Sequence, residues 1–136
     1  FFLVRPRSFG KTVFLDMLAD FFRGDEQAFT NLKIRKVGNV KYMRNMPDDR
    51  KIKSKWIKFP VIHISLVNFP PFFSREEFDR KFEEMLSDIA RLYKVSHEYI
   101  HLGSLIRELH LKFDGLPVVV LIDDFDTPVE RAPFVI

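Results

Sequence analysis

The residues best suited to chemistry lie near the start of the chain, where residues 5–12 read RPRSFGKT between an apolar run and a helical pattern. Such a turn lets consecutive backbone N–H groups and the helix N-terminus face the oxygens of a phosphate. The Lys-Thr pair adds a cation for the β- and γ-phosphates and a hydroxyl ligand for Mg²⁺. The pattern therefore predicts a phosphate-binding loop. Its nucleotide-contacting residues would be Arg7, Ser8, Phe9, Gly10, Lys11 and Thr12.

This loop departs at one position from the phosphate-loop pattern G-x-x-x-x-G-K-[ST]. Arg5 stands where the pattern has its first glycine, and an arginine does not adopt left-handed backbone angles cheaply. An ordinary strand, turn and helix is therefore the alternative interpretation of residues 5–12.

A pair of acidic residues provides the second chemical signal. Residues 118–122 are continuously apolar and are followed at once by Asp123 and Asp124. Ligands of open α/β sheets bind at the carboxyl ends of buried strands, and two carboxylates there are costly without a cation. We therefore expect Asp123 to hold Mg²⁺ through water and Asp124 to act as a general base on the attacking water. The alternative is a surface turn over residues 123–128, because Asp and Pro are ordinary turn residues.

The elements that would position these residues alternate between strand and helix. Apolar runs predict strands at residues 1–4, 59–66 and 117–122, and continuous apolar runs are typical of strands buried on both faces. Helical periodicity predicts helices at 11–23, from a capping box at Ser74 to Tyr93, and around 96–113. The alternation predicts an α/β fold, and together with the predicted phosphate-binding loop it leads us to expect a three-layer P-loop NTPase core with a mainly parallel sheet.

Composition limits the remaining classes of protein. The chain has 136 residues, 46% hydrophobic and 30% charged, which predicts one soluble domain and excludes a disordered or membrane-spanning chain. Sixteen Phe must pack inside the protein or against a partner. No Cys is present, which excludes disulfides, cysteine nucleophiles and thiolate zinc sites, and fits an intracellular, cytoplasmic location. The first residue is Phe, so we expect a chain that starts inside a domain.

The net charge of +3 is unevenly distributed along the chain. Residues 31–60 hold ten Lys or Arg against two Asp, a local net charge of +8. This stretch lies mostly in residues 24–58, whose weak periodicity predicts a long, partly irregular insertion. It could contact nucleic acid, but a solvated loop is favoured because no base-stacking or groove-reading pattern accompanies the charge.

Residues 97–101 read HEYIH and match the zinc peptidase motif H-E-x-x-H. That motif needs a third ligand, and the extended form would have Gly and His where Ser104 and Arg107 stand. The later carboxylates Glu108 and Glu130 do not lie at the expected spacing of about twenty residues. Two surface histidines near a helix start are therefore the favoured interpretation, with a zinc peptidase as a distant alternative.

Four segments together resemble the AAA-ATPase-like domain family, P-loop proteins often joined to a C-terminal PD-(D/E)XK nuclease-like region. The segments are 2–12, 15–18, 56–63 and 120–128. The family loop commonly reads Arg/Gly-Pro-Arg-Arg-Phe-Gly-Lys-Ser/Thr, so Arg5 is a habit of the family. The resemblance implies binding of ATP with Mg²⁺, with Lys11 at the phosphates and Thr12 at the metal.

The resemblance also shows where this chain differs and where it stops. The family's acidic strand end commonly reads Leu-Ile-Asp-Glu-Tyr-Asp, so Asp123 carries over whereas Asp124 replaces a Glu that is one methylene longer. A complete domain would continue into a sensor strand and a lid with an arginine finger, so residues 1–136 are expected to be a partial domain, incomplete at the C-terminus. We predict ATP binding with Mg²⁺, and hydrolysis coupled to conformational change in the intact protein. The alternative is a non-catalytic interaction module with weak or absent nucleotide binding.

Overall fold

The described part of the chain is an α/β structure. The computed structural model describes residues 10–43, 46, 54–66, 74–96 and 100–124. Two strands, β1 (Val61–Ser65) and β2 (Val119–Asp123), pair in parallel with Val61 opposite Val119. The strand predicted at residues 1–4 lies outside the described residues, and a complete three-layer core would need further strands, so that core stays a prediction.

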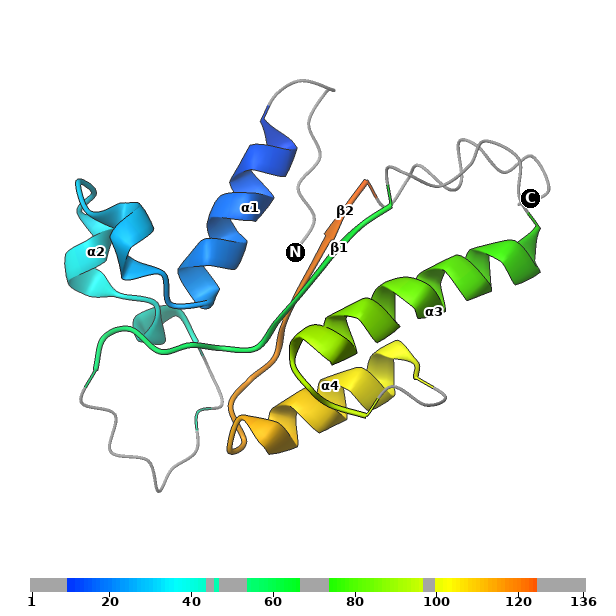
Figure 1. Ribbon diagram of the computed structural model, residues 1–136. Helices are drawn as coiled ribbons and strands as arrows, with labels where there is room; N and C mark the ends of the chain where they lie inside the picture. Colours follow the sequence, from blue (N-terminus) through cyan, green and yellow to red (C-terminus); the bar gives the residue numbers. More distant parts are fainter. Residues whose placement is uncertain (1–9, 44–45, 47–53, 67–73, 97–99, 125–136) are drawn as a thin grey trace.

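Helices lie on both sides of this two-stranded sheet (Figure 1). The first helix, α1 (Lys11–Phe22), lies on one side, and α3 (Arg75–Leu92) and α4 (Leu102–Lys112) lie on the other. The predicted capping box is confirmed, since the Ser74 hydroxyl accepts from the Glu77 amide and the Glu77 carboxylate accepts from the Ser74 amide. The helix predicted around 96–113 begins later, at Leu102.

The main core lies between β1 and the pair α3 and α4. Ile62 and Ile64 project from one face of β1 onto fully buried leucines of the two helices, Leu86, Leu105 and Leu109. On the outer edge of β1, the Tyr93 hydroxyl accepts from the Val61 amide at 2.9 Å and donates to the Val61 carbonyl at 3.1 Å. This pair of bonds satisfies strand-edge groups that would otherwise be open to another chain.

The prediction that the last apolar run is buried on both faces is wrong for β2 in the described structure. Val120 is 36% exposed and Ile122 is 40% exposed. Their register partners Ile62 and Ile64 belong to the main core, whereas Val120 and Ile122 do not. The reason is that α3 and α4 pack over β1 and leave this face of β2 partly open.

The segment between α1 and β1 forms three short helical turns, η1 (Glu26–Phe29), α2 (Ile34–Val37) and η2 (Val40–Tyr42). Phe21 at the end of α1 makes edge-to-face contacts with several rings of this segment, Phe29, Tyr42 and Trp56. Gly38 has φ +82° and approaches the Lys55 carbonyl so closely that a Cβ there would overlap its oxygen. Only glycine fits this approach.

None of the helices in the described residues has the length and apolar character needed to cross a membrane.

Candidate functional site

The start of α1 is open and uncapped in the way a phosphate site requires. Gly10 is the N-cap residue, with φ +76°, and provides no side chain to bond the first amide groups of the helix. Its carbonyl accepts from the Phe14 amide at 2.9 Å, so the helix proper begins at Lys11. Among the described residues, a Cβ built at Gly10 would meet no heavy atom within 4 Å. No acidic residue lies in the first turn to offset the positive end of the helix dipole.

A hydrogen bond joins this helix start to the end of β2. The Thr12 hydroxyl donates to the Asp123 carboxylate at 2.7 Å, across 111 positions of sequence. Asp123 is only 4% exposed, because it is the last residue of β2 and lies on the sheet face that α1 covers. The structure therefore brings together the two residues that the sequence analysis assigned to Mg²⁺, although their roles as ligands stay a prediction.

The other predicted site residues are placed less completely. Lys11 is the first residue of α1 and is half-buried. Asp124 follows β2 directly and has φ +55°, a left-handed conformation that Asp tolerates better than most residues. The remaining predicted nucleotide contacts, Arg7, Ser8 and Phe9, lie outside the described residues.

A second polar pair lies beside the first, and the sequence analysis assigned it no role. Asp16 is one helical turn after Thr12 on α1, and its Oδ1 lies 3.9 Å from Nε2 of His63 on β1. His63 is the register neighbour of Leu121, so it shares the sheet face of Asp123. The spacing of four between Thr12 and Asp16 was the one sequence signal that could have linked this pair to the site.

The alternative zinc site receives no support from the described residues. His101 is the N-cap of α4, and its Nδ1 accepts from the Ser104 amide at 3.1 Å. This capping role explains why the helix begins after His101, whereas His97 lies outside the described residues. No group of three or more acidic or histidine side chains able to hold a metal occurs in the part of the chain that is described.

The chain belongs to the AAA-ATPase-like family. The sequence pattern of that family, described as a predicted AAA-ATPase, matches residues 1–133. The resemblance inferred from the loop and the acidic strand end is thereby confirmed.

A curated relative is 31% identical over 133 residues, which cover 95% of this chain. It is an uncharacterized protein in the vnfD 5'region of Azotobacter chroococcum mcd 1. The chain spans only 22% of the length of that relative. No solved structure matches the chain.

Proposed function

We propose that this chain binds ATP with Mg²⁺ and, in the intact protein, contributes to ATP hydrolysis coupled to conformational change. The observation that carries the proposal is the 2.7 Å bond between the Thr12 hydroxyl and the Asp123 carboxylate. It joins the first turn of a helix that begins within a Gly-Lys-Thr sequence to a buried acid at the end of a parallel strand. Membership of a family described as a predicted AAA-ATPase agrees with this chemistry.

The described residues fit a phosphate-bound magnesium ion. The Thr12 hydroxyl donates its hydrogen bond to the Asp123 carboxylate, so the lone pairs of the hydroxyl oxygen stay available to a cation. Mg²⁺ prefers hard oxygen ligands, keeps several waters and takes one or two protein groups beside the substrate phosphates. Asp123 would hold one of those waters, and no described residue fills the space at Gly10, where phosphate oxygens would lie next to the amides of α1.

The cation and the base of the proposed site are Lys11 and Asp124. Lys11 begins α1, where its ammonium group can neutralise the β- and γ-phosphates that the helix N-terminus attracts. Asp124, one residue beyond the proposed metal-binding acid, would orient the attacking water. A three-layer P-loop core that continues the described sheet is the fold this proposal requires.

The direct test of nucleotide binding is Lys11→Ala. We expect the dissociation constant for Mg-ATP to rise at least tenfold, about 1.4 kcal/mol, because the phosphates lose their cation. Calorimetric titration of the full-length protein measures the change. The matched control is Lys81→Ala, an exposed lysine on α3, on the other side of the sheet. Equal affinity in Lys11→Ala and the parent protein would refute the phosphate-loop assignment.

A non-catalytic interaction module with weak or absent nucleotide binding is the second candidate function, and the shorter acid at Asp124 favours only its loss of catalysis. A carboxylate one methylene short of the family's Glu holds an attacking water less well, while ATP binding through Asp123 is unaffected. We therefore expect slow hydrolysis with intact ATP affinity. Asp124→Glu should raise the turnover number, with the dissociation constant changing less than about threefold.

The left-handed backbone at Asp124 makes a second variant necessary, because Glu tolerates φ +55° less well than Asp. Asp124→Asn keeps the size and the backbone tolerance but removes the charge, and we expect it to lower turnover at least tenfold. Steady-state phosphate release beside equilibrium ATP binding measures both variants. If Asp124→Asn keeps full turnover, Asp124 is not the base. If Asp124→Glu is slower than the parent while its thermal stability is unchanged, the length of the acid does not limit hydrolysis.

A further inference from the structure

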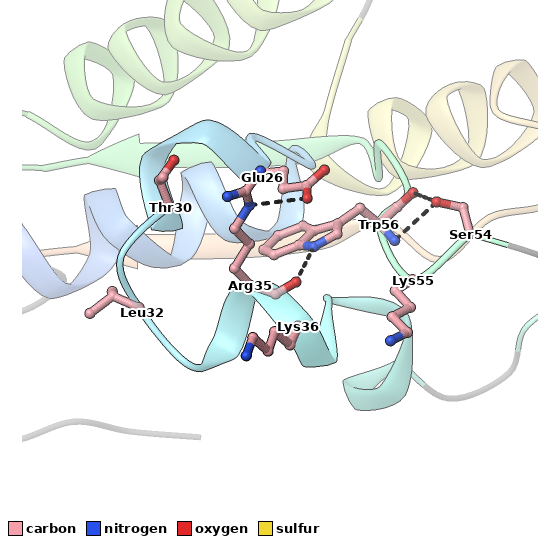
Figure 2. Close-up of a pocket in the computed structure, with 8 residues that line it drawn as sticks. All are labelled: Glu26, Thr30, Leu32, Arg35, Lys36, Ser54, Lys55 and Trp56. Carbon is pink, nitrogen blue, oxygen red and sulfur yellow. Dashed lines mark hydrogen bonds and ion pairs between the residues drawn. The ribbon is translucent and has the colours of Figure 1, made fainter.

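A concave pocket of about 560 Å³ lies in the basic segment, away from the proposed nucleotide site. It is formed where η1 and α2 meet the chain that leads into β1 (Figure 2). Its lining combines cations, small polar groups and one large aromatic ring: Glu26, Thr30, Leu32, Arg35, Lys36, Ser54, Lys55 and Trp56. Its volume lies in the range of pockets that hold a nucleotide-sized ligand.

Two lysines of the pocket have no ionic partner among the residues that the structure describes. Arg35 is already paired, since its Nε lies 3.2 Å from the Glu26 carboxylate. Lys36 and Lys55 are exposed, and neither forms an ion pair with any carboxylate among the described residues. In the view of Figure 2, both side chains lie below the Trp56 ring. The pocket therefore has a net positive charge, within a stretch of chain whose net charge is +8.

The aromatic ring of this pocket is held in place by the protein itself. Trp56 stacks on Phe29 with ring centroids 5.7 Å apart, and its Nε1 donates to the Arg35 carbonyl at 2.9 Å. Phe21 also contacts the ring edge-to-face. Trp56 remains half-buried, so part of the indole lines the pocket. A fixed ring loses little conformational entropy when a ligand packs against it.

We propose that this pocket binds single-stranded nucleic acid, with an unstacked base against Trp56 and the flanking phosphates at Lys36 and Lys55. Single strands are bound by aromatic side chains beside cations that follow the backbone. An acidic peptide would use the cations but has no base to place on the indole. Recognition of a duplex would need a protein helix or β-ribbon long enough to enter a groove of the nucleic acid, and α2 at this pocket has only four residues.

The test uses the full-length protein without nucleotide or Mg²⁺, so that it is independent of the proposed ATP site. Anisotropy of a fluorescent thymidine oligomer of about 15 nucleotides measures binding. The double variant Lys36→Glu/Lys55→Glu should weaken binding at least tenfold. It should also lower the salt slope of the binding constant by about 1.4, because each lost phosphate contact on a single strand contributes about 0.7.

The matched control is Arg80→Glu/Lys81→Glu, which makes the same charge change on exposed residues of α3. We expect its affinity for the oligomer to stay within twofold of the parent protein. A 4-thiothymidine in the oligomer should crosslink to the tryptic peptide that contains Trp56. This crosslink supports the pocket as the site by a measurement that does not depend on charge.

Four results would overturn the proposal. The first is that the oligomer does not bind at all. The second is that both double variants weaken binding equally, which would show diffuse attraction to a basic protein. The third is that polyglutamate of equal charge competes as strongly as the oligomer, which would indicate a site for acidic chains, and the fourth is that a duplex of the same length binds more tightly than the single strand.

Discussion

Asp123→Asn is expected to lower Mg²⁺-dependent ATP hydrolysis by about 10- to 100-fold, the usual cost of losing a group that orients a metal ion. Asn has the same shape as Asp, and its amide oxygen can still accept the hydrogen bond from the Thr12 hydroxyl. The variant therefore removes the negative charge from the buried end of β2 and retains the contact that joins β2 to α1. Phosphate release measured across a Mg²⁺ titration gives the result, and ATP affinity without metal should change by less than about threefold.

The control for this variant is Asp16→Asn. Asp16 lies on the same side of the sheet, one turn after Thr12, but its side chain is 62% exposed and faces His63. The Asp16→Asn variant makes the same change in charge without altering the proposed metal site, so hydrolysis should stay within about twofold of the parent protein. If both variants lose activity equally, the charge around α1 matters and a magnesium role for Asp123 is wrong. If Asp123→Asn keeps full hydrolysis, Asp123 does not hold the metal.

Asn39→Ala is expected to lower the free energy of unfolding by about 3 kcal/mol, because it removes three hydrogen bonds to backbone groups of Phe21 and Ile57 in a buried or half-buried environment. Asn39 is fully buried. Its Nδ2 donates to the Phe21 carbonyl at 2.9 Å and to the Ile57 carbonyl at 2.7 Å, and its Oδ1 accepts from the Ile57 amide at 2.9 Å. These bonds attach the chain that leads into β1 to the end of α1.

Denaturant unfolding followed by the fluorescence of Trp56, the one tryptophan of the sequence, measures this loss. Hydrogen exchange of the Ile57 amide should also become faster, since that amide loses its acceptor. Asn31→Ala is the matched control at an exposed position, and it should change stability by less than about 0.5 kcal/mol. Unchanged stability and unchanged exchange in Asn39→Ala would show that water replaces the amide and that the three bonds contribute nothing net.

Predictions that depend on neighbouring residues agreed with the structure. The capping box at Ser74 was predicted because its donors and acceptors lie three positions apart, so no distant part of the chain is needed. The helix after Gly10 and the apolar strands at β1 and β2 were recognisable from residue type and period. The late start of α4 was missed, because a histidine is an uncommon capping residue and its Nδ1 bond to Ser104 has no clear sequence signal.

By itself, the sequence determined the α/β alternation, the family and the choice of Thr12 and Asp123 as candidate magnesium ligands, because local periods and short motifs encode these properties. The tertiary structure alone decided how far each face of the sheet is covered and which bonds hold the segment between α1 and β1 in place. Burial of Val120 depends on where α3 and α4 end over the sheet, and the bonds of Asn39 join positions 18 apart that no period relates. The pocket at Trp56 was hidden for the same reason: only folding places the ring in one pocket with Lys36 and Lys55.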